Sequence, residues 1–173
     1  MDVIKEYIVK HKKTGKDTLM QFGVIFATFV ACIIVSILTM IIFPILQSIS
    51  IFLLVGVAYL GLRFLKNFNL EFEYIQTNNE IDIDKIIARS SRKRIVTIDF
   101  KNIEICAKVS DKEHKREYEN TNILKTFDCT GDGGDGVYFV DVPVDGGMNR
   151  ILFQPPQSMI ETAYKFNPRK VFI

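Results

Sequence analysis

One stretch of this sequence contains no charged side chain, and its length limits the folds that the chain can adopt. From Leu19 to Leu62, 44 consecutive residues include no Asp, Glu, Lys or Arg. The rest of the chain is rich in charge, because the 173 residues include 22 basic and 20 acidic side chains. Long apolar stretches of this kind are typical of segments that cross a lipid bilayer. The sequence therefore predicts a membrane protein.

The length of the apolar stretch predicts two membrane spans. One helix of this length would measure about 66 Å, roughly twice the thickness of the hydrocarbon core. Pro44 cannot continue a helical hydrogen-bond ladder, and three of the next six residues are polar. We therefore expect a helical hairpin over residues 19–66, with spans at about 19–43 and 49–65. A stripe of small residues on the first span is expected to let the two helices pack: Gly23, Ala27 and Ala31.

Basic residues on either side of the hairpin predict its orientation. Five lysines precede the first span, and Arg63 and Lys66 follow the second, whereas the connection between the spans has no basic residue. Lys and Arg concentrate in the cytoplasmic segments of membrane proteins. We therefore expect a multi-pass protein of the inner cell membrane with both termini in the cytoplasm. A cleaved signal peptide fits poorly, because the apolar stretch begins late and lacks a small-residue cleavage site.

The basic segment at residues 1–18 precedes the first span and carries apolar side chains at helical spacing, namely Val3, Ile4, Tyr7 and Ile8. This spacing predicts a short amphipathic helix. Two surfaces remain open as partners of its apolar side. One is the anionic face of the membrane, which would attract the neighbouring lysines, and the other is the soluble domain.

From residue 67 onward the hydrophobic pattern changes to short alternating runs separated by turn residues, which is typical of an antiparallel β domain. The first two runs flank the turn TNNE and predict a hairpin, with Asp82 and Asp84 on the solvated face of its second strand. The strongly charged segment 110–122 predicts a loop with room for one helical turn. Five further strands are expected, at about 94–100, 102–109, 123–127, 137–144 and 150–154.

A helix is expected near the end of the chain, at about 156–166, because prolines precede an amphipathic segment that stops before Pro168. Its apolar face is predicted to carry Met159, Ile160, Ala163 and Tyr164. Seven antiparallel strands followed by one helix suit a β-sandwich or partly open barrel that the helix caps. The expected fold class is therefore α+β, with a two-helix transmembrane hairpin before a cytoplasmic domain at 67–173.

The order of these segments resembles a pleckstrin-homology-like (bacterial PH-like) domain tethered by a two-helix membrane hairpin, a layout of several bacterial membrane protein families. The resemblance covers about residues 19–173 and rests on FEYIQTNNEIDIDKI, SRKRIVTIDFKNIEI and FQPPQSMIETAYKFNPRKVF. It implies a membrane-anchored binding or scaffold module without catalysis. Lipid-reading members of the wider superfamily carry a Lys-x(n)-basic-x-Arg pattern around their first strand pair. Lys85, Arg92 and Arg94 match that spacing but fall between the second and third expected strands.

Basic side chains gather where those two strands meet, in the stretch IARSSRKRIVTIDF. Together with one lysine of the preceding strand they form a candidate lipid- or anion-binding site, which consists of Lys85, Arg89, Arg92, Lys93 and Arg94. The alternatives are a solvated turn between strands and nonspecific contact with an anionic membrane. From residue 63 onward the chain has 17 basic and 17 acidic residues, so no wider basic field supports specific recognition.

The glycine-rich loop DCTGDGGDG presents a second candidate. Its acids Asp128, Asp132 and Asp135 offer oxygen ligands to calcium, although no Glu stands where an EF-hand would need one. A hairpin loop that needs positive φ angles explains the glycines equally well. His11 and His114 are isolated from any other ligand, so we assign no metal and no cofactor. The three cysteines are odd in number and far apart, which favours a reducing compartment: Cys32, Cys106 and Cys129.

No combination of residues predicts catalysis or nucleic-acid binding. An enzyme would need a pocket that gathers distant acids such as Asp99 and Asp141, and no motif demands one. No aromatic platform is interleaved with the basic residues, as single-stranded nucleic acid would require. The expected function is therefore non-enzymatic interaction at the cytoplasmic face, with the lipid bilayer and a membrane or cytoplasmic protein as partners. The alternative is a lipid-headgroup-binding module that uses the basic turn 89–94.

Overall fold

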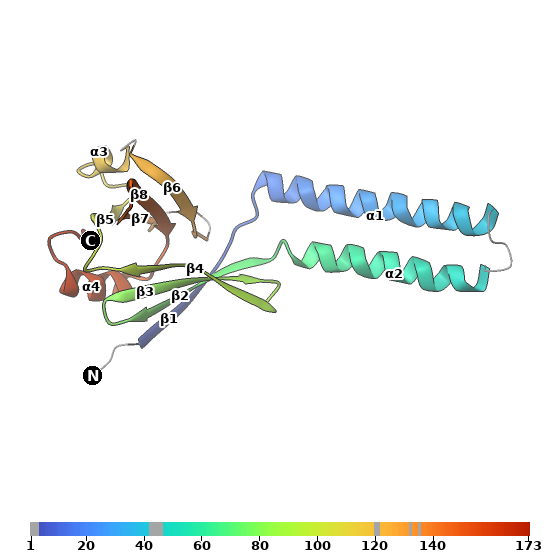
Figure 1. The fold of residues 1–173 in the computed structure, drawn as a ribbon, viewed down its shortest axis with the longest axis horizontal. Helices are drawn as coiled ribbons and strands as arrows, with labels where there is room; N and C mark the ends of the chain where they lie inside the picture. Colours follow the sequence, from blue (N-terminus) through green and yellow to red (C-terminus); the bar gives the residue numbers. More distant parts are fainter. Residues whose placement is uncertain (1–3, 42–46, 120–121, 132, 135) are drawn as a thin grey trace. The chain divides into compact units, whose positions relative to one another are not determined.

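The chain folds into two compact units, and the residues of one unit come from both sides of the other along the sequence. The computed structural model describes all residues except 1–3, 42–46, 120–121, 132 and 135 (Figure 1). One unit, the helical hairpin, spans Lys13–Asn69. The other, the β domain, combines residues 1–12 with Leu70–Ile173. The β domain therefore contains residues from both sides of the helical hairpin.

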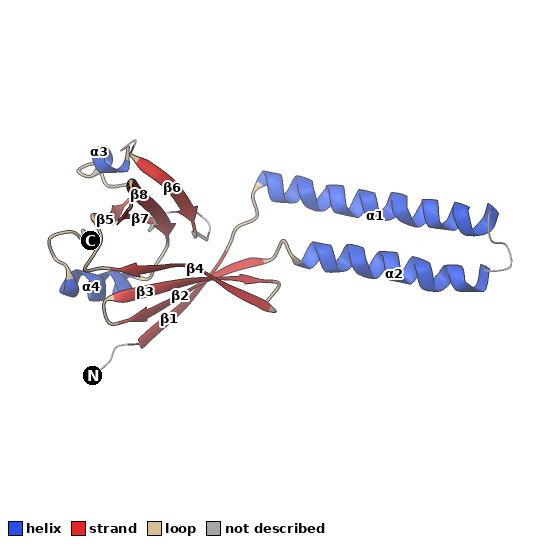
Figure 2. Ribbon diagram, in the orientation of Figure 1, coloured by secondary structure: helices blue, strands red, loops and turns tan. Residues whose placement is uncertain are grey.

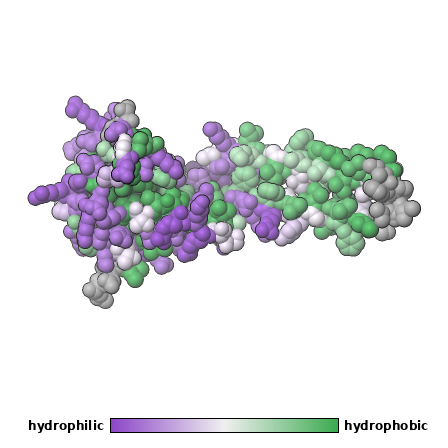
Figure 3. All heavy atoms as spheres, viewed as in Figure 1, coloured by the Kyte–Doolittle hydropathy of each residue, from purple (hydrophilic) through white to green (hydrophobic). Residues whose placement is uncertain are grey.

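The helical hairpin consists of α1 (Gly15–Ile41) and α2 (Gln47–Lys66). Both helices are long and apolar enough to cross a membrane, as the charge-free stretch predicts. Large apolar side chains are exposed along them, and Figure 3 shows the resulting hydrophobic surface. The helix α1 begins before the expected Leu19 because Thr14 and Asp17 form a reciprocal cap, in which each backbone N–H donates to the side chain of the other residue. The predicted break at Pro44 lies outside the described residues.

The two helices pack through a seam that differs from the expected small-residue stripe. Gly61 of α2 is buried against Thr28 of α1, and a methyl group added at Gly61 would lie 2.5 Å from Thr28 Oγ1. A methyl group added at Gly23 would meet nothing within 4 Å, and Ala27 is exposed. The prediction that Gly23 and Ala27 pack against the second span is therefore wrong. The contact instead uses the helix face that carries Thr28. The Thr28 hydroxyl donates a hydrogen bond to the Val24 carbonyl within α1.

The first sheet of the β domain, sheet A, has the order β1-β2-β3-β4 and is antiparallel (Figure 2). Its strands are β1 (Ile4–Lys10), β2 (Leu70–Thr77), β3 (Glu80–Ile87) and β4 (Ser91–Asp99). The prediction of an amphipathic helix near the N-terminus is therefore wrong, because residues 4–10 form an edge strand. Val9 is partly buried against the core, whereas Tyr7 and Ile8 are exposed, so this strand is defined by its pairing with β2 and not by a clear hydrophobic period.

The second sheet, sheet B, has the order β5-β7-β8-β6. Its strands are β5 (Ile105–Lys108), β6 (Ile123–Asp128), β7 (Tyr138–Val144) and β8 (Gly147–Phe153). The described residues thus hold eight strands in two four-stranded sheets, not the seven expected, and the additional strand is β1. The sheets are not wholly antiparallel, because β6 pairs with β8 in parallel. The charged loop contains one short helix, α3 (Lys115–Tyr118), as expected.

The hydrophobic core draws on both sheets and on the last helix, α4 (Gln157–Phe166). Met159, Ile160 and Ala163 are buried as predicted. Tyr164, which was expected on the same apolar face, is 42% exposed. Tyr74 of β2 links the two sheets, because its hydroxyl donates to the Cys129 carbonyl at 2.5 Å and accepts from the Gln154 N–H. The expectation of a domain capped by a C-terminal helix is confirmed in these contacts.

The helical hairpin is inserted between two strands that are neighbours in sheet A. The register pairs Lys10 with Glu71, and one more hydrogen bond, from the His11 N–H to the Leu70 carbonyl at 3.0 Å, extends the ladder. The connections to α1 and α2 are short, comprising residues 11–14 and 67–69. The ladder therefore fixes the two points at which the chain leaves and re-enters the β domain.

Candidate functional site

The five residues of the predicted anion site lie on β3, on the β3–β4 turn and on β4, but sheet A divides them between its two faces. The register places Lys93 opposite Lys85, and Lys85 opposite the core residue Phe72. Because side chains alternate along a strand, Arg92 and Arg94 project from the other face. The lysines and the arginines therefore do not form one cluster.

Each arginine of the outer face is paired with carboxylates of neighbouring strands. Arg94 lies at the centre of the best-defined contact: its Nε is 2.7 Å from Asp84 Oδ1 and its Nη1 is 2.8 Å from Asp82 Oδ2. The hydrogen bond to Asp84 raises the pKa of the Arg94 guanidinium above its ordinary value. Arg92 reaches across β3 to Glu73 of β2, with Nη2 3.0 Å from Oε2. At the turn, Arg89 Nε lies 3.2 Å from Glu71 Oε1.

The carboxylates of this face are less exposed than the arginines. We call these four acids the acidic ladder: Glu71, Glu73, Asp82 and Asp84. Glu73 and Asp84 are buried and stand opposite each other in the register, so two like charges face one another across β2 and β3. The prediction that solvation explains Asp84 is therefore wrong. Buried carboxylates need paired cations, and the arginines of β4 supply them.

A shallow pocket of about 320 Å³ opens beside the turn, between Arg89 and Arg92. Ser90, Ser91, Ile86 and the acid Glu71 line it together with the two arginines. Ala88 and Arg89 hold the turn with φ angles of 54° and 56°, in the left-handed region that ordinary residues seldom adopt. Arg89 contacts Glu71 through its Nε, so the two Nη groups of the guanidinium lie outside that ion pair.

The first residues of the glycine-rich loop, the second candidate, contact β1 and the two residues that follow this strand. The Gly131 carbonyl accepts from the Lys12 N–H at 2.9 Å, and His11 Nδ1 lies 3.2 Å from the Thr130 carbonyl oxygen. Gly131 packs so closely on Val9 that a side chain there would overlap it. Asp132 and Asp135 lie outside the described residues. Among the residues that are described, no group of three His, Cys, Asp or Glu side chains is arranged to hold a metal ion.

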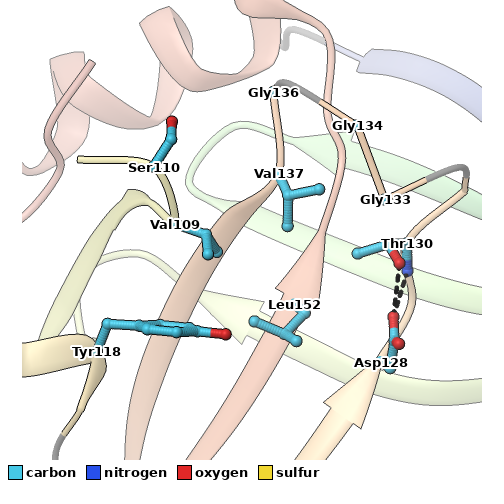
Figure 4. A pocket seen from close by; sticks show the side chains of 10 residues that line it. All are labelled: Val109, Ser110, Tyr118, Asp128, Thr130, Gly133, Gly134, Gly136, Val137 and Leu152. Atoms are coloured by element: carbon cyan, nitrogen blue, oxygen red, sulfur yellow. Dashed lines mark hydrogen bonds between the residues drawn. The ribbon is translucent and has the colours of Figure 1, made fainter. Parts of the chain in front are cut away.

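A pocket of about 440 Å³ lies beside this loop, on the outer side of sheet B (Figure 4). Asp128 lines one side, where its Oδ1 accepts from the Thr130 N–H at 3.0 Å and from the Thr130 hydroxyl at 2.7 Å. Tyr118 lines the other side, and Leu152 lies between them (Figure 4). Sequence reasoning identified Asp128 only as a metal ligand and did not identify the pocket, because its walls come from four separate segments of the chain.

The acids that an enzymatic function would have needed are both engaged in structural contacts. Asp141 of β7 is buried and binds Arg150 of β8 through two contacts of 2.7 Å. Asp99 accepts hydrogen bonds from the side chains of Asn79 and Asn102 and from the Lys101 N–H. The contacts of Asp141 lie within sheet B, and those of Asp99 lie in the turn after β4, so both acids have a structural role.

The cysteines and histidines of the β domain make no catalytic pair among the described residues. Cys106 and Cys129 are buried free thiols, and burial raises both pKa values, that of Cys129 to about 12. His114 hydrogen-bonds to Asp111 at 2.8 Å and stacks on Phe172, with ring centres 3.9 Å apart. A thiol with a raised pKa is a poor nucleophile at neutral pH. His114 and the two buried thiols are therefore part of the packing of the β domain.

Comparison with known proteins yields one match. A family model described as a bacterial PH-like domain (DUF6106) matches residues 1–173, the whole chain. No curated protein and no solved structure matches it. The resemblance inferred from the order of segments is confirmed.

Proposed function

We propose, from the premise that the chain belongs to the bacterial PH-like domain family DUF6106, that it is a membrane-anchored, non-enzymatic interaction protein. In this proposal the helical hairpin crosses the inner cell membrane, and the β domain binds a membrane or cytoplasmic protein at the cytoplasmic face. The observation that carries the proposal is the insertion of two apolar helices between the paired strands β1 and β2.

This insertion supports anchoring because it leaves little free chain between the two units. An extended residue spans at most about 3.5 Å, so connections of this length reach roughly 14 Å and 10 Å. A domain tied to a membrane-embedded hairpin in this way would stay near the bilayer. Confinement raises its effective concentration for partners in the same membrane, so weak contacts suffice for binding.

Lysine positions support the cytoplasmic orientation, which labelling of single introduced cysteines tests. We would compare Ser48→Cys, between the two predicted spans, with Lys112→Cys in the exposed charged loop of the β domain. A membrane-impermeant maleimide should label Ser48→Cys in intact cells and Lys112→Cys only after permeabilisation. Cys106 and Cys129 are buried and give little background. Labelling of Lys112→Cys in intact cells would contradict the orientation.

A second experiment tests the interaction itself. Photo-crosslinkers on exposed positions of the β domain would be compared in two chains, the full chain and one in which a two-residue turn replaces residues 13–69. The proposal predicts one recurrent protein crosslink in the native membrane and its loss when the helical hairpin is removed. Crosslinks that are unchanged without the hairpin would show that anchoring plays no part in binding.

A second candidate function is binding of an anionic lipid headgroup at the basic turn, which the pocket between Arg89 and Arg92 favours. Arg89 is the residue to test, because its side chain is 72% exposed and it pairs with only one acid. Arg92 and Arg94 are unsuitable, since their loss would leave buried acids unpaired. Full chain in anionic nanodiscs should bind soluble headgroup phosphates less tightly with Arg89→Gln than with Lys93→Gln, a matched change on the opposite face. Equal binding by both variants would eliminate this candidate.

A further inference from the structure

The pocket beside the glycine-rich loop has two kinds of wall. Val109, Val137 and Leu152 give it an apolar surface, and Tyr118 adds an aromatic ring at one end. Asp128 provides a carboxylate at the other end, across Leu152 from the tyrosine (Figure 4). The volume of about 440 Å³ lies within the range of sites that bind ligands in proteins.

These walls are held in place by contacts outside the pocket. Arg150 fixes the Tyr118 segment, because its guanidinium donates to the carbonyls of Glu117 and Tyr118 and lies 5.0 Å from the Tyr118 ring centre. The buried carboxylate of Asp141 in turn fixes Arg150. In addition, the Val109 N–H donates to the Val137 carbonyl at 2.9 Å. A ligand would therefore find a formed pocket and lose little binding free energy to reorganisation.

The charge of the pocket is not balanced by its own residues. None of the described residues that line it is Lys, Arg or His, and within the described part of the chain Asp128 makes no ion pair. Thr130 occupies Asp128 Oδ1 alone, which leaves Oδ2 to accept from a ligand. This differs from the acidic ladder of sheet A, where each carboxylate is already paired with an arginine.

We infer that this pocket receives a lysine or arginine side chain of the protein partner. The aliphatic stem lies along Val109, Val137 and Leu152, and the cationic group donates to Asp128. Such side chains combine a long apolar stem with a charged end, and the pocket offers the same two features in the same order. The inference rests on the proposed function and specifies the chemistry of the partner.

The test uses the full chain in nanodiscs and methyl NMR of the valine and leucine side chains. The probe is N-acetyl-lysine methylamide, and the comparison probe is the norleucine analogue, which keeps the stem and lacks the charge. We expect the lysine probe to shift the methyl signals of Val109, Val137 and Leu152. The norleucine probe should bind about tenfold more weakly, because it lacks the charged hydrogen bond.

Two variants make the test specific. Asp128→Asn should weaken the lysine probe about tenfold, whereas Asp145→Asn, an equal charge change at an exposed loop position, should leave its affinity unchanged. Equal binding of both probes, no shift at the solubility limit, or equal effects of the two variants would overturn the inference. Shifts produced by calcium chloride alone and lost in Asp128→Asn would also overturn it, in favour of a metal site.

Failure of this inference is distinguishable from failure of the proposed function. If the membrane-dependent crosslink persists in Asp128→Asn at wild-type yield, the protein still acts as an anchored interaction module, but its partner binds at another surface. If the crosslink is reduced by Asp128→Asn and not by Asp145→Asn, both the proposed function and the inferred pocket are supported.

Discussion

The two sheets of the β domain use arginine in different ways. On the outer face of sheet A and its β3–β4 turn, three partly exposed arginines pair with the four carboxylates of the acidic ladder. In sheet B a single buried arginine, Arg150, joins Asp141 to the backbone of α3 and so holds a segment over the sheet. A run of basic residues in the sequence, such as the one at 89–94, can therefore serve to pair acids of neighbouring strands and need not form a binding site. The pocket beside the glycine-rich loop differs, because its described lining holds one acid, Asp128, and no basic side chain that pairs with it.

The two sheets also differ in how their strands are distributed along the sequence. Sheet B is built from residues 105–153, whereas sheet A needs β1 from before the helical hairpin and β2 to β4 from after it. Removing the N-terminal part of the chain should therefore damage sheet A and leave every strand of sheet B present.

The largest expected effect is the loss of β1. A fragment of residues 67–173 lacks the strand that covers Phe72 and Tyr74, and we expect it to lose several kcal/mol, a large part of the stability of a small domain. A matched chain in which a two-residue turn joins residues 4–11 to 70–173 should fold, since His11 and Leu70 are already paired. Urea unfolding by circular dichroism compares the two. Equal unfolding free energies would contradict the assignment of β1 to the domain.

The next largest effect is expected in sheet B. Arg150→Met should lower the free energy of unfolding by about 3–5 kcal/mol, because it leaves the buried Asp141 carboxylate unpaired. The double variant Arg150→Met with Asp141→Leu removes both charges and should recover much of the loss. Urea titrations of the single and double variants measure this difference. A double variant that is as unstable as the single one would show that packing of the Arg150 side chain, not its charge, is decisive.

The corresponding change in sheet A should have a smaller effect. Arg94→Gln leaves Asp84 with a weaker, neutral donor, and we expect a smaller loss of unfolding free energy than in Arg150→Met. The loss is smaller because half of the Arg94 side chain is already in water. Adding Asp84→Asn should restore part of the stability. A loss equal to that of Arg150→Met would contradict the distinction between the two sheets.

The smallest effect near neutral pH concerns titratable groups at the contact between the two sheets. Burial raises the pKa of Cys129 to about 12 from an ordinary value of 9.0, and it also raises that of Tyr74. Groups with raised pKa values stabilise the folded state below their unfolded pKa and lose that contribution as pH rises. The unfolding free energy should therefore be insensitive to these groups below about pH 9 and fall between pH 9 and 12. Cys129→Ala should reduce the slope in that range, and an unchanged slope would assign the decline to other groups.

Most helices and strands of the fold could be predicted from the spacing of hydrophobic residues along the sequence. The charge-free stretch predicted α1 and α2, and alternation predicted β2 to β8, because long or repeated patterns leave few alternative structures. The N-terminal strand was missed, since four apolar residues at positions 3, 4, 7 and 8 fit a short helix as well as an edge strand. No local signal reveals that this segment pairs with β2 beyond an inserted hairpin.

The candidate sites were less accessible from the sequence. The basic cluster was visible, but its neutralisation depends on the register that brings Arg94 beside Asp84 and lets Arg92 reach Glu73. The i, i+2 spacing of acids on two strands and of arginines on a third was the available signal. The pocket beside Asp128 had no such signal, because Val109, Tyr118 and Leu152 are distant in the sequence and meet only in the folded domain.

The most direct test of the account asks whether β1 pairs with β2 in the full chain within its native membrane. Glu6 and Ile75 are partners in the register and occupy a pair that does not exchange backbone hydrogen bonds, the arrangement that brings side chains closest. Oxidation of Glu6→Cys with Ile75→Cys should give a disulfide detectable by mass spectrometry, whereas Glu6→Cys with Gln76→Cys should not, because Gln76 faces the core. A disulfide in the first pair alone would establish that the helical hairpin is an insertion within one β domain. No disulfide, or equal yields in both pairs, would contradict it.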